Sequence, residues 1–136
     1  MPDRPASTDD RAALISALSD VLDEHALRRL ADLDPDDRGG LLRRVLLTYE
    51  QSLRRLAAQF EQARSDGDAV GLRQVAHTLK SSSASVGALA LARHCADIER
   101  ALRDGTEPQA LQGDLDAMTQ QCRIVLAALQ PVAASA

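Results

Sequence analysis

The chain has 136 residues, of which 45% are hydrophobic and 26% charged, and its formal net charge is −4, as is typical of one globular domain. That charge, with one Tyr, one Phe and no Trp, argues against a protein that binds nucleic-acid backbone or stacks bases on aromatic side chains. No apolar run approaches the ~18 residues of a membrane span, the first ten residues lack the apolar stretch of a secretory signal, and Cys95 and Cys122 are too few for a disulfide scaffold or a metal cluster. We therefore expect a cytoplasmic protein that contacts neither nucleic acid nor a membrane.

Two flexible tails are expected, at residues 1–10 and at residues 131–136, because the first is rich in proline and the second is small and nearly featureless. Between them, residues 11–130 are predicted to form one helical domain, with its core bundle at about residues 34–130. At the start of this domain, two groups of apolar residues favour one or two short helices: Leu14, Leu18 and Val21, and then Leu27, Leu30 and Leu33.

The middle of the chain shows the strongest helical periodicity. Apolar residues alternate at spacings of four and three from Leu42 to Ala63, which predicts one long helix with a single buried face. This helix is expected to end at Asp66 and Gly67, because glycine readily adopts the left-handed conformation of a helix cap. Asp68 is expected to begin the next helix, whose buried face holds Leu72, Val75, Ala76 and Leu79.

Two further helices follow a stretch of small residues from Ser81 to Gly87. The first is expected to stop at Gly105, and Thr106 with Gln109 matches a capping box for the second. Their apolar positions are Ala88, Leu91, Cys95, Ile98 and Leu102, and then Leu111, Leu115, Met118, Cys122, Val125 and Leu129. Four long amphipathic helices with short loops predict an all-α fold, an antiparallel up-down four-helix bundle with one or two additional short N-terminal helices.

His77 differs from His25 and His94, for which ordinary surface positions are expected. At ~100° per residue, His77 lies about 160° from the centre of the apolar face of its helix. The positions that share its face, Ser81 and Ala84, are small, whereas an exposed helix face usually carries long charged side chains. An imidazole on such a bare face is open to close approach by another protein.

The single lysine of the chain lies three residues after His77. Of the 16 basic residues, Lys80 is the only one that is not an arginine. An ammonium group on a flexible stem is a mobile point charge, whereas a guanidinium group is a planar fork. One mobile cation beside one exposed histidine fits a bound or developing phosphoryl group.

The segment HTLKSSSASVGA, residues 77–88, resembles the histidine phosphotransfer (HPt) domain of multistep two-component phosphorelays. The family pattern has His, Leu at +2, Lys at +3, Gly at +4 and, after small residues, Gly at +10. This sequence departs from it at +4, where Ser81 replaces glycine but is still small. The resemblance covers roughly residues 24–127. The matching motif positions are His77, Leu79, Lys80 and Gly87.

The resemblance implies that His77 accepts a phosphoryl group on Nε2 from an aspartyl phosphate of a response-regulator receiver domain and passes it to the aspartate of another receiver. Lys80 would offset the negative charge of the phosphoryl group. In the family, a carboxylate or amide 22 residues after the histidine accepts a hydrogen bond from Nδ1, and Glu99 occupies that position here. Arg103, one turn further on, is expected to add positive charge near the site.

The expected partners are receiver domains, a hybrid sensor histidine kinase, or both, and the domain is expected to be a monomer. Their docking surface would be the face around His77. No intrinsic cofactor or metal is expected, since Mg²⁺ would come with the receiver. The sequence has no nucleotide-binding loop, so we expect a phosphotransfer protein without an ATP-binding kinase domain, and whether it counts as an enzyme stays open. The predicted docking residues are Arg73, Ser81, Ala84, Ser85 and Gly87.

Three alternative functions also fit a small helical domain. A non-catalytic helical adaptor, a degenerate HPt domain, would bind receivers or kinases without phosphorylation, but the joint presence of His77, Lys80 and Glu99 argues against it. A metal-binding four-helix bundle is disfavoured because no Glu-x-x-His pair occurs. A domain of a chemotaxis-type kinase, phosphorylated by an ATP-binding domain, stays open. So does the choice between a free-standing protein and the C-terminal domain of a hybrid kinase.

Overall fold

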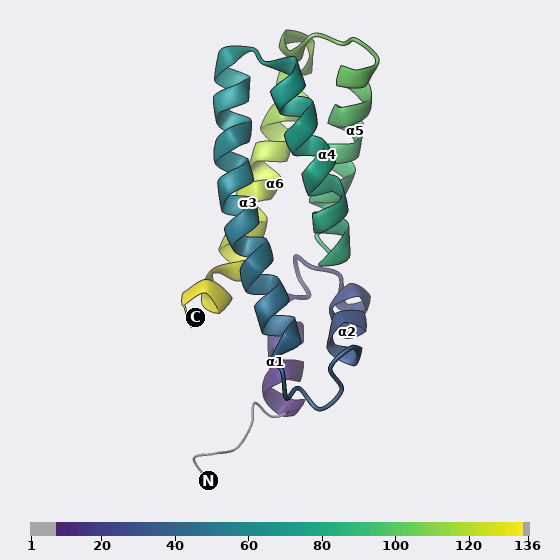
Figure 1. The fold of residues 1–136 in the computed structure, drawn as a ribbon, viewed down its shortest axis with the longest axis vertical. Coiled ribbons are helices and arrows are strands. Elements are labelled where there is room, and N and C mark those ends of the chain that lie inside the picture. The colour runs from purple at the N-terminus through teal and green to yellow at the C-terminus, as the bar shows by residue number, and fades with distance from the viewer. Residues whose placement is uncertain (1–7, 135–136) are drawn as a thin grey trace.

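Every regular element is a helix in residues 8–134, the part of the chain that the computed structural model describes (Figure 1). This confirms the predicted all-α fold. The helices are α1 (Thr8–Leu18), α2 (Glu24–Asp32), α3 (Leu41–Asp66), α4 (Ala69–Ser85), α5 (Leu89–Arg103), the short 3₁₀ helix η1 (Pro108–Leu111) and α6 (Gln112–Ala134).

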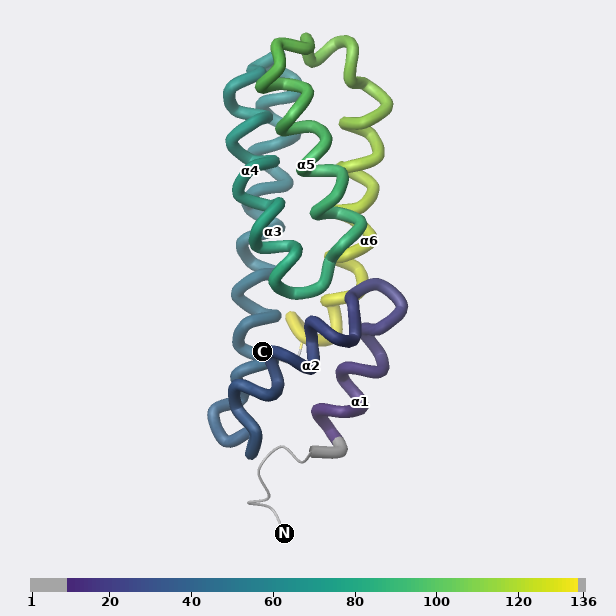
Figure 2. The backbone as a smooth tube through the Cα atoms, turned by 90° about the vertical axis from the view of Figure 1, so that its right-hand side faces the viewer, coloured from purple at the N-terminus to yellow at the C-terminus, as the bar shows by residue number. Residues whose placement is uncertain are grey.

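The four long helices form an up-and-down bundle in chain order. Helix α4 packs between α3 and α5, and α6 returns between α5 and α3, so that α6 lies diagonally opposite α4 (Figures 1 and 2). The short helices α1 and α2 lie below the turn between α4 and α5, beside the first half of α3. We call α1 and α2 together the N-terminal cap. The backbone N–H of Asp23, which precedes α2, donates to the C=O of Gly87 at 2.8 Å and joins this cap to the bundle.

The core follows the predicted apolar seams of the four long helices, and every seam position named for them above is buried. Both aromatic residues, Tyr49 and Phe60, lie in this core. Burying one leucine side chain contributes about 1.5–3 kcal/mol, so a bundle with leucine at half of its seam positions has little need of aromatic residues. The N-terminal helices follow their pattern less closely, because Leu33 is 72% exposed while Ile15 and Leu22 are buried.

Aspartate side chains cap the N-termini of two helices. Asp23 accepts a hydrogen bond from the N–H of Ala26 at the start of α2, and Asp68 accepts one from the N–H of Gly71 at the start of α4. Each bond satisfies a backbone donor that the first helical turn leaves without a partner. At the end of α3, Gly67 adopts the predicted left-handed conformation, with φ of 65°. Together, Gly67 and Asp68 make the tight turn that places α4 against α3.

The predicted capping box at Thr106 and Gln109 is wrong. Glu107 takes an extended conformation, and Pro108 begins the 3₁₀ helix η1, with no side-chain hydrogen bond at its start. Proline suits the first position of a helix because its φ is fixed and its missing N–H would have had no partner there. Helix α6 therefore begins at Gln112, later than the pattern indicates.

The predicted C-terminal tail is also wrong over the residues described. Helix α6 continues through Pro131 to Ala134, and Val132 is 1% exposed. Val132 lies three residues after the buried Leu129, so the apolar seam continues past the proline. At the other end, α1 begins at Thr8, inside the predicted tail of residues 1–10, and residues 1–7 lie outside the described part.

Candidate functional site

His77 lies on the outer face of α4, as predicted. Its side chain is 70% exposed, while Leu72, Val75 and Leu79 on the same helix are buried in the core. The imidazole is thus attached to a rigid helix whose other face is fixed by packing, and it is accessible to a second protein.

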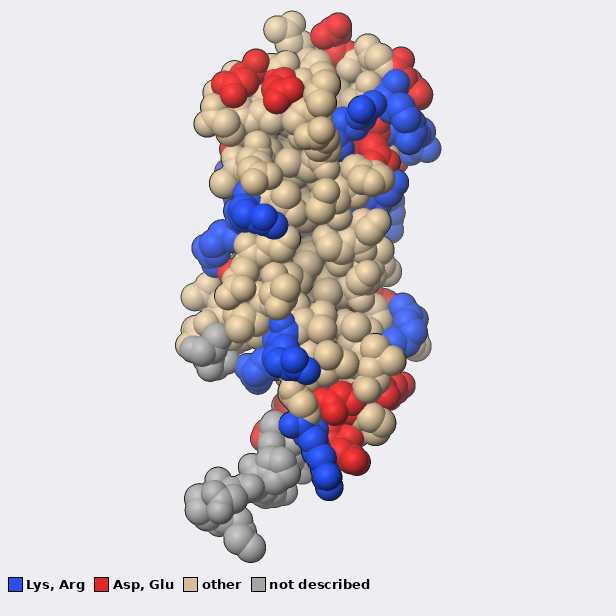
Figure 3. Space-filling view, in the orientation of Figure 1, with Lys and Arg blue, Asp and Glu red and all other residues tan. Residues whose placement is uncertain are grey.

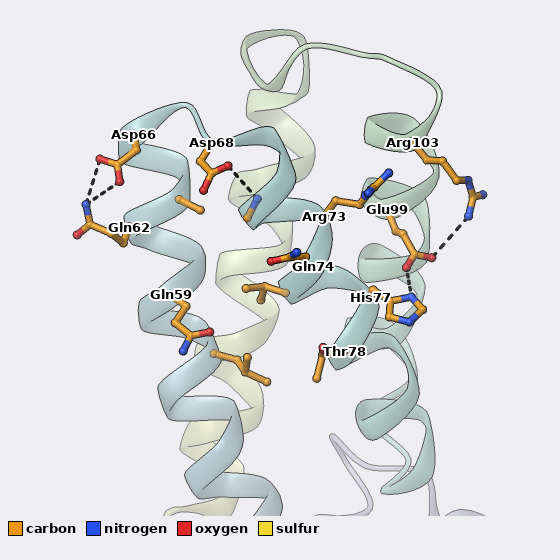
Figure 4. A pocket seen from close by; sticks show the side chains of 14 residues that line it. Gln59, Gln62, Asp66, Asp68, Arg73, Gln74, His77, Thr78, Glu99 and Arg103 are labelled. Atoms are coloured by element: carbon orange, nitrogen blue, oxygen red, sulfur yellow. Dashed lines mark hydrogen bonds and ion pairs between the residues drawn. The ribbon is translucent and has the colours of Figure 1, made fainter.

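Glu99 on α5 joins His77 to Lys80. Its side chain is only 7% exposed, and its Oε2 accepts a hydrogen bond from Nδ1 of His77 (Figure 4). Its other oxygen, Oε1, accepts a hydrogen bond from Nζ of Lys80 at 2.7 Å. The structure therefore brings together the three residues that the resemblance singled out, on adjacent turns of two packed helices.

The charge of Glu99 determines which nitrogen of His77 is free to react. The hydrogen bond from Lys80 lowers the pKa of Glu99, burial opposes this effect, and the hydrogen bond from His77 adds to the lowering. Glu99 is therefore a carboxylate at neutral pH, and a carboxylate can only accept hydrogen bonds. Nδ1 of His77 must then carry the proton, which leaves the lone pair of a neutral imidazole on Nε2, facing away from Glu99.

Two arginines stand near this group. Nη1 of Arg103 lies 3.9 Å from Oε1 of Glu99, and its side chain is 58% exposed. Arg73, one turn before His77 on α4, is exposed and lines the same surface depression as His77, Glu99 and Arg103. Figure 4 shows Arg73 and Arg103 on the Glu99 side of the imidazole ring. The depression thus carries two arginines near His77, while Asp66 and Asp68 line another part of it.

Of the predicted docking residues, four are exposed: Arg73, Ser81, Ala84 and Ser85. Gly87 is not, and its assignment to a docking surface is wrong. It is buried, its φ is 84°, and a Cβ atom there would lie 2.7 Å from the backbone nitrogen of Asp23. Glycine is needed at this position because the α4–α5 turn lies directly against the N-terminal cap.

The roles of Tyr49 and Ser83 were not predicted from the sequence. Ser83 is fully buried, and its hydroxyl shares a 2.8 Å hydrogen bond with the hydroxyl of Tyr49 on α3. Four residues after the buried Leu79, Ser83 falls on the core face of α4, and that position was the available signal. The bond fixes α4 against α3 one to two turns beyond His77.

The surface around the site is uneven in charge. In the view of Figure 3, a band of uncharged side chains covers the middle of the bundle, and Lys and Arg gather on both sides of it. A groove between α3 and the end of α4 is lined mostly by uncharged residues, among them Val45, Thr48, Ser52, Ser82 and Ser85, together with Arg44. Over residues 8–134, no group of His, Cys, Asp and Glu side chains is arranged to hold a metal ion. None of the helices in that range has the length and hydropathy of a membrane span.

Comparison with known proteins identifies the family. The family model of the Hpt domain matches residues 44–130, which include α4, α5 and most of α3 and α6. The chain belongs to the Hpt domain family. The family and the fold together support a histidine-phosphotransfer role in a two-component phosphorelay. Comparison with curated proteins gives no significant match.

Three solved structures share the fold of this Hpt domain. Histidine-containing phosphotransfer protein B (HptB) from Pseudomonas aeruginosa is 25% identical, with a TM-score of 0.69 over 85% of this chain and 96% of that one. The HPT domain of a sensor hybrid histidine kinase from Shewanella is 20% identical, with a TM-score of 0.67 over 79% and 92%. A rice protein described as a histidine-containing phosphotransfer protein is 20% identical, with a TM-score of 0.74 over 95% and 92%.

Proposed function

We propose that His77 is the phosphoacceptor of a relay, taking a phosphoryl group from an aspartyl phosphate of one receiver domain and passing it to an aspartate of another. The observation that carries this proposal is the exposed imidazole whose Nδ1 is held by the buried carboxylate of Glu99. A carboxylate in this position orients a histidine and stabilises the imidazolium that forms in the reaction.

The transfer needs no proton to leave Nε2. The lone pair of Nε2 attacks the phosphorus atom, the N–P bond forms, and the P–O bond to the donor aspartate breaks with its electron pair on the carboxylate oxygen. The proton on Nδ1 stays in its hydrogen bond, so Glu99 faces a developing positive charge in the imidazole ring. Transfer to the second receiver is the same step in reverse, and Lys80 is near enough to offset phosphoryl charge.

The partner is a receiver domain that docks on the face around His77. The exposed residues Ser81, Ala84 and Ser85 leave room for close approach, and the positive charge of Arg73 suits the acidic pocket of a receiver. The carboxylates of that pocket hold the Mg²⁺ that the reaction uses, so the active site is shared between two proteins. The donor is a free receiver or the receiver of a hybrid sensor kinase.

The test is transfer from a receiver that has been charged with a small phosphodonor such as acetyl phosphate. Label is expected on this protein, acid-labile and alkali-stable as phosphohistidine is, and His77→Gln is expected to abolish it. Replacing His25, an exposed histidine on α2, with glutamine is the matched control and leaves labelling unchanged. Label that persists in His77→Gln contradicts the proposal. Binding of receivers without any transfer would support the non-catalytic adaptor instead.

A further inference from the structure

Two cations face the same oxygen of Glu99 at unequal distances. Nζ of Lys80 is hydrogen-bonded to Oε1 at 2.7 Å, while Nη1 of Arg103 stands 3.9 Å from that atom, beyond hydrogen-bond range. Within residues 8–134, Glu99 is the partner that the structure gives to the Arg103 side chain. Arg103 is also the more exposed of the two, at 58% against 37% for Lys80. A small rotation of its side chain would close the gap.

The two cations come from different helices, Lys80 from α4 and Arg103 from α5. Figure 4 shows Arg103 on the Glu99 side of His77, with the second ring nitrogen pointing away from both. Lys80 is on α4, three residues after His77, and residues at that spacing are neighbours on a helix surface. A phosphoryl group on Nε2 therefore lies within reach of Lys80 and on the far side of the ring from Arg103.

Phosphorylation creates competition for the ammonium group of Lys80. A phosphoryl group carries a charge of about −1.5 to −2 at pH 7 and three strong acceptor oxygens. Glu99 is buried, however, and a buried carboxylate that loses its partner is strongly destabilising. His77 still holds Oε2, but Oε1 loses its hydrogen bond when Lys80 turns toward the phosphoryl group, so a second cation that closes onto Oε1 favours this movement.

We propose that Lys80 and Arg103 exchange places on Glu99 when His77 is phosphorylated. Lys80 leaves Oε1 for the phosphoryl oxygens, and Arg103 closes onto Oε1 in its place. The inference rests on the proposed function, because it takes Nε2 of His77 as the phosphorylated atom. The N–P bond forms and the donor's P–O bond breaks as above, and no proton moves between Glu99 and either cation. Arg103 is thus a positioning residue that acts through Lys80.

The exchange gives a physical reason for the single lysine in this chain. The moving cation needs a flexible stem and a charge that can turn between two anions, as an ammonium group has. The replacing cation stays on one carboxylate, where the planar guanidinium is well suited.

The test uses the isolated protein phosphorylated on His77 with phosphoramidate, so that no receiver is needed. The pKa of the phosphoryl group is read by ³¹P NMR titration. In Arg103→Gln, Lys80 is retained by Glu99, and the phosphoryl pKa is expected to rise by about half a unit, about threefold in proton affinity. Arg100→Gln is the matched control, since Arg100 is an exposed arginine on the same helix that pairs with Asp97. Arg73 is unchanged in every variant, so its electrostatic effect on the phosphoryl pKa is the same in all of them and does not affect the comparison.

A double-mutant cycle separates exchange from a direct effect of Arg103 on the phosphoryl group. In the Lys80→Gln background no exchange can occur, so adding Arg103→Gln is expected to raise the phosphoryl pKa clearly less than it does when Lys80 is present. An equal rise in both backgrounds overturns the proposal, as does a ¹⁵N resonance of the Lys80 ammonium that does not move on phosphorylation.

Failure of the proposed function gives a different result. If phosphoramidate labels His77 but charged receivers do not, the relay function fails, and the exchange is still judged by the titration. If phosphoramidate leaves His77 unlabelled, Nε2 is not an available nucleophile and both proposals are overturned.

Discussion

Glu99 holds Nδ1 of His77 with one oxygen and Nζ of Lys80 with the other, so two side chains on α4 depend on one carboxylate on α5. Glu99 is buried, and a carboxylate that is shielded from water depends on its protein partners for stabilisation of its charge. The orientation of the imidazole is therefore tied to the packing of α4 on α5.

This arrangement predicts a pH-dependent contribution of Glu99 to stability. Folding lowers the pKa of Glu99 below its ordinary value of 4.5, so the carboxylate stabilises the folded state above that pH. The contribution is lost as the pH falls through the lowered pKa. At pH 7 we expect a lower free energy of unfolding in urea for Glu99→Gln than for wild type. This difference is expected to shrink below pH 4.5. Glu107→Gln, at an exposed carboxylate, controls for loss of charge alone, and a difference that is constant with pH contradicts the prediction.

At the scale of elements, the turn between α4 and α5 is held against the N-terminal cap by a glycine. Gly87 has positive φ, and its backbone oxygen accepts a hydrogen bond from Asp23. The turn also determines how α5 returns along α4, and so how Glu99 lies opposite His77. Close approach of two backbones, rather than flexibility, is the reason for glycine there.

Gly87→Ala is expected to lower the free energy of unfolding by at least about 2 kcal/mol, because the backbone of Asp23 or the turn must shift to admit a methyl group. Gly67→Ala is the matched control: Gly67 also has positive φ, but open space surrounds it. Its cost is expected to be about 1 kcal/mol, from the left-handed backbone alone. Chemical denaturation measures both, and equal losses would show that the contact with the cap carries no energy.

At the scale of the whole molecule, the core extends further along α6 than the sequence pattern indicates. Val132 is buried, so the helical turn after Pro131 adds to the packed interior. The last turn of the helix is thus part of the cooperative fold.

Deleting residues 131–136 is therefore expected to lower the free energy of unfolding by about 1.5–2 kcal/mol, the cost of exposing one valine and shortening the helix. Val132→Ala in the full chain is expected to reproduce about half of this loss or more. Thermal and urea unfolding measure both. A truncated chain as stable as the full one would show that the last turn is not part of the cooperative unit.

Most of the fold could be predicted from the sequence because seam positions repeat with helical spacing over 20 residues or more, as on α3. Local departures from this helical pattern could not be predicted. A proline usually ends a helix, and only the position of Val132 indicates that α6 continues. Gly87 could be read as a small surface residue, because its contact with Asp23 joins positions 64 residues apart. Within the site, the resemblance pointed to Glu99, but the unequal distances of Lys80 and Arg103 from Oε1 needed three-dimensional positions.

The hydrogen bond between Tyr49 and Ser83 also gives the protein an intrinsic optical probe. The chain has one tyrosine and no tryptophan, so its near-ultraviolet emission comes almost entirely from Tyr49. That ring lies in the core, and its hydroxyl is bonded to the part of α4 that follows His77. Any displacement of α4 relative to α3 that alters this bond changes the emission, without a label and without interference from other residues of the chain.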